Sequence, residues 1–368
     1  MESEMRSRIV IISMVLVVLW GCESQPTIEK NPEPLSVATR VADHYIASRT
    51  PRLYYADLLT FYGLLRVAEA TGDNDYEGYV DKMIRIFNQT GPTDPITFRN
   101  YEMGGIAGAY RFVQGEYPDD PALLPEHVRL LIEEHPRDDM GVFCHPRQKG
   151  GKIWVDCLYA VNPFLSMAAV VLDRPELHTE SISQYEGMEA QLYDQEIKLF
   201  HQVKNFGPEG CTSDDTWGRG NGWALIGLAE LIKYLPDEHP KKDVMIDKLQ
   251  IFMNALVPLQ AESGMWRQNL ITPTSYEETS GTGLILYAMA MGINEGWLSE
   301  DYIPVAVKAW NGLAQQVDEQ GAVHNTCVGT RAVCDSGVDY FLNRPTTIDD
   351  PHGFGPVLLA AVEMARLE

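Results

Sequence analysis

A single aspartate stands among aromatic and apolar side chains in the stretch Trp154-Val-Asp-Cys-Leu-Tyr159. An apolar setting disfavours the charged form of a carboxyl group and raises its pKa. A carboxyl group that keeps its proton near neutral pH can serve as a general acid. Asp156 is therefore the first candidate catalytic residue, with Trp154 beside it as a candidate binding residue. The alternative is a carboxylate that stabilises a helix N-terminus.

A second cluster, Trp217-Gly-Arg-Gly-Asn-Gly-Trp223, places an arginine between glycines and aromatic residues. An unpaired guanidinium is costly where helices bury apolar groups. We expect Arg219 to pair with the carboxylate of an anionic ligand, although a structural aspartate would also satisfy it. Trp217 and Trp223 offer flat faces to a ligand ring, whereas core packing is favoured for Trp223. No strand precedes the glycines, so they do not predict a dinucleotide site.

Helices must position these residues, because helical patterns recur along the chain and strand signals are almost absent. Apolar helices alternate with amphipathic ones, and a helix that is apolar all round must be buried on all sides. Six buried and six half-exposed helices predict six helical hairpins in two concentric layers, an all-α (α/α)6 barrel over residues 35–368. A solenoid is the rival, but no fixed repeat occurs. The predicted helices are 35–49, 54–71, 74–89, 103–115, 121–135, 154–172, 178–200, 217–235, 239–261, 278–295, 301–317 and 354–367.

Such a ring brings distant residues to one rim, because its inner helices run parallel and their N-termini face the same side. The polar and aromatic clusters that begin these helices should therefore surround one cavity. Six positive helix ends at that rim favour an anionic ligand. The converging residues are Tyr55, Asp57, Tyr101, Glu102, Gly104, Gly105, Trp154, Asp156, Trp217, Arg219, Trp223, Ser280 to Gly283, and His352.

The overall charge is strongly acidic: 29 Lys and Arg against 52 Asp and Glu give a formal net charge of −23 over 368 residues. Phosphate contacts need a basic face, so this balance argues against a nucleic-acid partner. An anionic ligand would have to bind at a local island of positive potential. We expect no metal and no cofactor, because the histidines lack His or Cys partners at ligand spacing.

The N-terminus predicts export. Arg6 and Arg8 precede an apolar run over residues 9–20, which ends at Leu19-Trp-Gly-Cys22. The run is too short to span a bilayer, suits a secretory signal and resembles a bacterial lipobox. We expect a signal peptide over residues 1–22, lipidation of Cys22, a tether over residues 23–34, and an exported lipoprotein of the cell envelope whose only membrane contact is this anchor. A generic signal peptide or a buried strand is the alternative.

Five further cysteines make an odd number without a Cys-x-x-Cys pair. Cys327 and Cys334 could bridge across a loop, but buried thiols are the default expectation.

Four motifs resemble those of the unsaturated glucuronyl/rhamnogalacturonyl hydrolases, most closely glycoside hydrolase family 105, which is related to family 88. They occur in the family's order between Ala42 and the C-terminus: Trp154–Phe164, Trp217–Trp223, Ser280-Gly-Thr-Gly283 and Asp350-Pro-His-Gly-Phe-Gly-Pro356. The resemblance implies an (α/α)6 barrel that acts on products of polysaccharide lyases, of rhamnogalacturonan or ulvan type. The family hydrates the C4–C5 double bond of a terminal unsaturated uronic acid, and the resulting hemiketal opens and expels the next sugar.

The resemblance also implies roles for individual residues. Asp156 occupies the family's catalytic position, as proton donor and then as base for the water. Glu102 stands near the family's second carboxylate, where an aspartate is more common, and its alternative is a first-turn glutamate. His145 and His201 resemble substrate-contacting histidines, although surface or capping roles compete.

Tyr55 is a further binding candidate at the rim, with Lys152, Arg344 and His352 as weaker ones.

Two other functions remain open from the sequence. One is an ordinary inverting glycosidase that uses Glu102 and Asp156 as its acid and base, about 6.5–9.5 Å apart. The other is a non-catalytic, lipid-anchored glycan-binding protein. An isomerase on a similar barrel is more remote, because no paired histidines stand at helix starts. The sequence makes no prediction of the oligomeric state.

Overall fold

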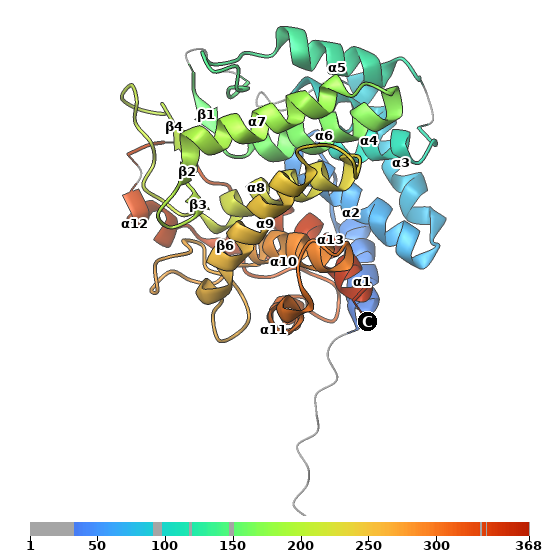
Figure 1. Ribbon diagram of the computed structural model, residues 1–368. Helices are drawn as coiled ribbons and strands as arrows, with labels where there is room; N and C mark the ends of the chain where they lie inside the picture. Colours follow the sequence, from blue (N-terminus) through green and yellow to red (C-terminus); the bar gives the residue numbers. More distant parts are fainter. Residues whose placement is uncertain are drawn as a thin grey trace, which may run out of the picture. The chain divides into compact units, whose positions relative to one another are not determined.

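The computed structural model describes residues 33–90, 98–117, 120–146, 151–331, 333–335 and 337–367. The predicted signal, Cys22 and most of the tether lie outside the described residues. In the described ranges, no helix is both long enough and apolar enough to span a bilayer. The helices, shown in Figure 1, are α1 (Pro34–Ser48), α2 (Tyr55–Thr71), α3 (Asn74–Thr90), α4 (Gly105–Val113), α5 (Leu123–Glu134), α6 (Cys157–Leu172), α7 (Glu176–Leu192), α8 (Gly218–Tyr234), α9 (Lys242–Leu256), α10 (Thr279–Asn294), α11 (Ile303–Ala314), α12 (Gly337–Leu342) and α13 (Pro351–Ala365), with a 3-10 turn η1 (Arg99–Met103) before α4.

Six helices form a closed inner ring. Around it α2 packs against α4, α4 against α6, α6 against α8, α8 against α10, α10 against α13, and α13 against α2. The inner helices are buried on every side: α8 has no exposed residue from Gly218 to Ile232, and α10 none from Thr279 to Gly292. The predicted all-round burial is confirmed for these helices.

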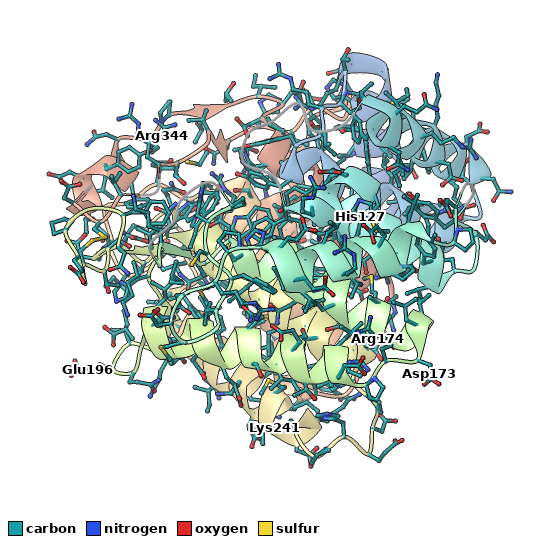
Figure 2. The ribbon with its side chains drawn as sticks, turned by 90° about the horizontal axis from the view of Figure 1, so that it is seen from above. His127, Asp173, Arg174, Glu196, Lys241 and Arg344 are labelled. Atoms are coloured by element: carbon teal, nitrogen blue, oxygen red, sulfur yellow. A yellow bond between two sulfur atoms is a disulfide. The ribbon has the colours of Figure 1, made fainter. Side chains whose placement is uncertain are left out.

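The outer layer consists of helices that bury one face. α1 packs on α2 and α13, α3 on α2, α5 on α6, α7 on α6, α9 on α8, and α11 on α10 (Figure 1). In α9 the buried residues recur every three or four positions, from Met245 to Leu256. Asp173, Glu196 and Lys241 are exposed on the outside of the layer, as Figure 2 shows. Two concentric layers of alternating helices confirm the (α/α)6 barrel.

Glycines allow the inner helices to approach closely. A Cβ on Gly227 of α8 would lie 2.8 Å from the carbonyl oxygen of Leu158 in α6. A Cβ on Gly283 of α10 would lie 2.7 Å from the Cβ of Pro356 in α13. Any larger residue at these two positions would force the helices apart.

The main differences from the predicted elements concern short strands. The helix expected over 178–200 ends at Leu192, where the chain turns into the antiparallel pair β2 (Tyr193–Asp194) and β3 (Leu199–Phe200). The helix expected to begin at residue 154 begins at Cys157 instead, because β1 (Ile153–Trp154) pairs with β4 (Val203–Lys204). A third pair joins β5 (Thr326–Cys327) and β6 (Thr346–Thr347), and the short α12 was not expected.

The disulfide differs from the bridge considered for Cys327 and Cys334. Cys334 bonds instead to Cys211, 123 residues away. The backbone N–H of Cys334 donates to the carbonyl of Phe206 at 3.1 Å, which brings the two segments together. Cys327 is held in β5, and it is a free, buried thiol like Cys144 and Cys157.

Candidate active site

The N-termini of the inner helices meet at one rim. Tyr55 begins α2, Asp156 precedes α6, and Arg219, Ser280 and His352 stand in the first turns of α8, α10 and α13. Two hydrogen bonds tie these helix starts together: Tyr55 Oη lies 2.6 Å from Nε2 of His352, and Nη1 of Arg219 donates to Ser280 Oγ at 3.0 Å. The inner helices therefore run parallel, as the ring model requires.

Asp156 is buried at this rim with an unpaired carboxyl group. The residue is 6% exposed, and among the described residues neither carboxyl oxygen has a hydrogen-bond partner. It occupies the N-cap position of α6, yet its side chain makes no capping bond. Asp156 thus stands at a helix N-terminus, as the alternative interpretation expects, but its side chain does not cap the helix through a hydrogen bond.

Burial raises the pKa of Asp156 well above the usual range of an aspartate. The positive charge of Arg219 opposes this shift, and the negative charge of Asp215 adds to it. A carboxyl group in such a site holds its proton at pH values where an exposed aspartate is ionised. Asp156 can therefore donate a proton to a ligand, as a general acid must.

Aromatic side chains surround the acid. Tyr55 and Tyr101 lie close enough to Asp156 for its charge to contribute to the raised pKa of both, although burial contributes most. Trp223 is fully buried and stacks on Tyr159, with ring centroids 4.7 Å apart. The hydroxyl of Tyr159 donates to the carbonyl of Tyr55 at 3.0 Å. Trp223 therefore packs behind the tyrosines of the site, in agreement with the core-packing interpretation, and neither face of its ring is open to a ligand.

Arg219 is fully buried without an ion pair in the part of the chain that the structure describes. Nη1 donates to Ser280 Oγ and, at 2.7 Å, to the carbonyl of Cys327, while Nη2 donates to the carbonyl of Val328 at 3.1 Å. The guanidinium lies 4.8 Å from the ring centroid of Trp217, which is itself 1% exposed. Nε–H and one N–H of Nη2 remain available, so Arg219 can meet a carboxylate only along this edge.

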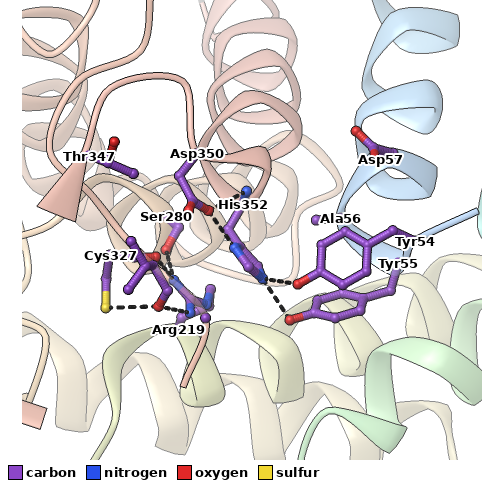
Figure 3. Close-up of polar contacts among 12 residues, drawn as sticks. Tyr54, Tyr55, Ala56, Asp57, Arg219, Ser280, Cys327, Thr347, Asp350 and His352 are labelled. Carbon is purple, nitrogen blue, oxygen red and sulfur yellow. Dashed lines mark hydrogen bonds and ion pairs between the residues drawn. The ribbon is translucent and has the colours of Figure 1, made fainter. Parts of the chain in front are cut away.

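His352 connects a carboxylate with two phenols, as Figure 3 shows. Its Nδ1 lies 2.5 Å from Oδ1 of Asp350, and its Nε2 lies 2.9 Å from Tyr54 Oη and 2.6 Å from Tyr55 Oη. Burial, assisted by Arg219, lowers the pKa of His352 to about 4. For Asp350, burial raises the pKa, but the hydrogen bonds that it accepts from His352 outweigh this effect, so the pKa is lowered. The imidazole is therefore neutral beside an ionised aspartate.

The two predicted histidines have different neighbours. The ring of His145 lies beside Trp154, with centroids 5.2 Å apart. His201 instead binds the backbone carbonyl of Asp215 through Nδ1 at 2.8 Å, and its Nε2 lies 3.8 Å from Asp194 in β2. His145 is thus next to the segment that carries Asp156, whereas His201 faces the β2–β3 hairpin.

Two carboxylates predicted at the rim are paired with arginines. Glu102 accepts from Arg99 at 2.9 Å and lies 4.0 Å from Nε2 of His127, which stands on the outer helix α5 (Figure 2). Asp57 accepts from Arg49 at 2.7 Å and lies apart from the His352 network in Figure 3. These ion pairs distinguish both carboxylates from Asp156, whose carboxyl group has no hydrogen-bond partner among the described residues.

Several residues of the site were not expected from the sequence. Asp215 is fully buried, and its Oδ1 accepts the backbone N–H of Trp217 at 3.0 Å. Glu278 caps α10 and accepts from Ser280 Oγ at 2.7 Å. Tyr54 directly precedes the predicted Tyr55, and this neighbour was the sequence signal that could have identified Tyr54. Asp350 opens the fourth motif, which was its signal in the sequence, whereas backbone carbonyls such as those that bind Arg219 leave no trace in a sequence.

Buried polar atoms without a partner gather at this rim. Buried donors and acceptors are normally hydrogen-bonded, so a cluster of exceptions indicates a ligand that satisfies both kinds. At the rim these atoms include Nε1 of Trp154, Trp217 and Trp223, Nε of Arg219, Oε1 of Gln202 and both carboxyl oxygens of Asp156, while others, such as Oε2 of Glu230 and Nε of Arg66, lie elsewhere in the described residues. Within the same ranges no group of three His, Cys, Asp or Glu side chains is placed to hold a metal ion.

Comparisons with known proteins agree with this geometry. The family model for Glycosyl Hydrolase Family 88 matches residues 35–368. An unsaturated 3S-rhamnoglycuronyl hydrolase of Formosa agariphila is 33% identical over 181 residues, which cover 46% of this chain and 48% of that protein. The chain thus spans about half the length of that relative. A protein of the same name from Alteromonas sp. is 27% identical over 330 residues, 83% of this chain and 76% of that protein.

A solved structure shows the same fold. The crystal structure of a possible member of family GH105 from Salmonella enterica superimposes with a TM-score of 0.81. It is 22% identical in sequence, and the match covers 96% of this chain and 100% of that one. Helices of both layers are therefore common to the two proteins.

Proposed function

Because this chain belongs to glycosyl hydrolase family 88, we propose that it removes a 4,5-unsaturated uronic acid from the non-reducing end of oligosaccharides made by polysaccharide lyases. The reaction is hydration of the C4–C5 vinyl ether. The observation that carries this proposal is the buried carboxyl group of Asp156, which has a raised pKa and no protein partner among the described residues. Protonating an alkene carbon requires such an acid.

Asp156 donates its proton to C4 of the unsaturated uronate. Positive charge then develops at C5 and on the ring oxygen, and water adds at C5. The hemiketal formed in this way opens and releases the next sugar. Asp156 becomes a carboxylate in this step, and the charge of the buried Arg219 stabilises that ionised form, since it acts to lower the pKa of Asp156.

The anionic sugar is recognised by donors at the same rim. Nε–H and one N–H of Arg219 form an edge suited to a carboxylate, and the indole N–H groups of Trp154 and Trp217 are further donors. The names of the two relatives support a rhamnose next to the unsaturated uronate. We therefore place the substrate among oligosaccharides of rhamnogalacturonan or ulvan type.

An inverting glycosidase has less support. That reaction needs two carboxyl groups on opposite sides of the glycosidic bond. Glu102, its expected second member, is paired with Arg99 rather than with any group at Asp156. A glycan-binding protein would gain nothing from an unpaired buried acid, which only costs stability.

The test is to incubate the protein with lyase digests of ulvan, rhamnogalacturonan and other anionic polysaccharides and to follow the absorbance of the conjugated alkene. We expect that absorbance to fall with at least one digest, and Asp156→Asn to abolish the fall. If every unsaturated digest stays intact while a saturated p-nitrophenyl glycoside is cleaved, the inverting mechanism is correct instead.

We also propose that the protein is exported and anchored to the bacterial cell envelope through a lipid on Cys22. The basic and apolar N-terminal residues support this, and a disulfide between Cys211 and Cys334 suits an oxidising compartment. Cys22→Ala should move the protein from the detergent fraction of a cell lysate to the aqueous one. Equal partitioning of both forms would contradict the anchor.

A further inference from the structure

Asp215 is a buried carboxyl group of the rim to which the proposed hydration assigns no role. The residue is 0% exposed. Its Oδ1 accepts the backbone N–H of Trp217 at 3.0 Å, and its Oδ2 accepts that of Gln202 at 3.4 Å. Its backbone carbonyl lies 2.8 Å from Nδ1 of His201. Asp215 therefore joins the start of α8 to the segment that enters β4.

Gln202 connects Asp215 with the segment that carries the acid. The backbone N–H of Val155 donates to the carbonyl of Gln202 at 3.0 Å, next to the pairing of β1 with β4. Val155 directly precedes Asp156. A single residue thus stands between the carboxyl group of Asp215 and the chain at Asp156, so a charge on Asp215 lies close to the acid.

The hydrogen bonds of Asp215 suit a carboxylate. Both of its oxygens accept N–H groups, and the hydroxyl of Ser213 also bonds to it. Burial raises the pKa of Asp215, while these hydrogen bonds and the charge of His201 act in the opposite direction. Donors on both oxygens favour the charged form, which has no proton to place between them. Asp215 therefore brings a negative charge to the site.

Two charges of opposite sign act on Asp156. Burial contributes most to its raised pKa, the positive charge of Arg219 lowers the pKa, and the negative charge of Asp215 raises it. The charged and titratable groups around Asp156 are Arg219, Asp215, Tyr55, Tyr101 and Cys157. Arg219 stands in α8, two residues after Trp217, so Asp215 also fixes the helix start from which the opposing charge comes.

The hydration needs both states of Asp156. The O–H bond of Asp156 breaks as the C4–H bond forms. Water then bonds to C5, and the carboxylate of Asp156 takes a proton from it, which restores the acid. A group that gives and regains a proton in each cycle works best when neither of its two states is held too strongly.

On the premise of the proposed function, we propose that Asp215 is a positioning residue of the hydration that acts through Asp156. It ties the segment of Asp156 to the start of α8, and its negative charge keeps the proton on Asp156 in the resting enzyme. Arg219 has the opposite effect and stabilises the carboxylate that follows proton transfer. Asp215 itself exchanges no proton.

Asp215→Asn tests this role through the pH profile. Asparagine has the same shape, and its oxygen can still accept the N–H of Trp217, but it carries no charge. Without that charge the pKa of Asp156 falls, so the pH above which kcat/KM declines should move down by about 1 pH unit. At pH values below this decline, kcat/KM should stay within about 5-fold of the wild type, because only the longer bond to Gln202 is lost.

An equal loss of kcat/KM at every pH, with the decline at the wild-type pH, would show a purely structural role and overturn the proposal. Asp215→Ser serves as a second uncharged variant if the asparagine variant does not fold. Its hydroxyl can also accept the N–H of Trp217, and it should move the decline in the same direction.

Asp194→Asn is the matched control. Like Asp215, Asp194 accepts the backbone N–H of the second residue after it, here Glu196, at 2.7 Å. Its side chain is 33% exposed, however, so water and salt screen its charge. Asp194→Asn should leave the pH of the decline unchanged. A shift as large as that of Asp215→Asn would show a general effect of net charge and would also overturn the proposal.

Infrared titration separates this proposal from the proposed function, because it needs no turnover. The C=O band that Asp156→Asn removes should persist in the wild type to a pH about 1 unit higher than in Asp215→Asn. Titration of the band at the same pH in both proteins would overturn the proposal. Loss of the band from Asp215→Asn at every pH would also overturn it, since Asp215 itself would then hold the proton. If the band shifts as expected but the wild type consumes no unsaturated digest, the proposed function is wrong and the effect of Asp215 on the proton of Asp156 stands.

Discussion

Asp156 and Glu363 are buried acidic side chains at opposite ends of the inner helical ring, and among the described residues only Glu363 is paired. At the N-terminal rim, Asp156 has no partner within the described residues. At the other end, Glu363 of α13 is fully buried and fully paired: Oε1 accepts from Arg66 at 2.9 Å, and Oε2 from Arg366 at 2.7 Å and Asn294 at 3.0 Å. Burial alone thus does not mark the active end, whereas an unpaired buried acid does.

A second acid at that end, Glu230 of α8, is fully buried and half paired. Its Oε1 accepts from the hydroxyl groups of Tyr62, at 2.9 Å, and Tyr287, while its Oε2 has no partner among the described residues. With the Arg66–Glu363 pair, it joins α2, α8, α10 and α13 at the end of the ring where the inner helices finish. These polar contacts join the helices at that end, as the Tyr55–His352 and Arg219–Ser280 bonds do at the rim, where Asp156 has no partner among the described residues.

The largest expected effect is on catalysis at the rim. Asp156→Asn removes the proton donor and should lower kcat by about 1,000-fold, within the range for general acids, while substrate binding persists. Turnover on a lyase digest and calorimetric binding of the same oligosaccharide provide the two measurements. A kcat of Asp156→Asn above about a tenth of the wild-type value would contradict the catalytic role of Asp156 and with it the contrast to Glu363.

The matched change at the opposite end should affect stability instead. Glu363→Gln leaves Arg66 buried without its carboxylate and should cost about 3 kcal/mol of unfolding free energy. The kcat of the folded molecules should stay within about 3-fold of wild type, because the site is distant in the ring. Denaturant unfolding measures the loss of stability, and kcat per folded molecule measures the activity. A loss of kcat as large as that of Asp156→Asn would contradict a purely structural role for Glu363.

The raised pKa of Asp156 predicts a pH-dependent stability difference. An unfolded aspartate ionises near pH 4, whereas folding keeps Asp156 protonated, so the folded state binds one more proton above that pH. Wild-type stability is therefore reduced as pH rises, by about 1.4 kcal/mol per unit of raised pKa. Asp156→Asn lacks this penalty and should unfold at a higher temperature at pH 8, with the gap closing toward pH 4. A wild type that is the more stable at pH 8 would argue for an ionised, paired Asp156.

The smallest effect is expected at Glu102. Its carboxylate is paired with Arg99, so Glu102→Gln should reduce kcat by less than about 10-fold. Initial rates on the unsaturated digest measure this. A loss of kcat as large as that of Asp156→Asn would show that Glu102 is the second catalytic carboxylate and would support a two-acid mechanism.

The sequence predicted every helix of both layers, because burial on all sides or on one side leaves a periodic pattern in each segment. It also predicted the apolar setting of Asp156, since Trp154 and Tyr159 are neighbours in the chain. The sequence could not predict the Cys211–Cys334 disulfide, because that bond joins segments 123 residues apart. The sequence could not predict the hydrogen-bond partners of Arg219 either, because backbone carbonyls belong to every residue type.

The central claim is that Asp156 is un-ionised at neutral pH, and infrared difference spectroscopy of wild type against Asp156→Asn tests it directly. A protonated carboxyl group has a C=O stretch that an ionised one lacks. We predict that this band is present in the wild type at pH 7, shifts in heavy water and is absent from the variant. If the band disappears from the wild type above pH 5, Asp156 is an ordinary carboxylate and cannot be the proton donor.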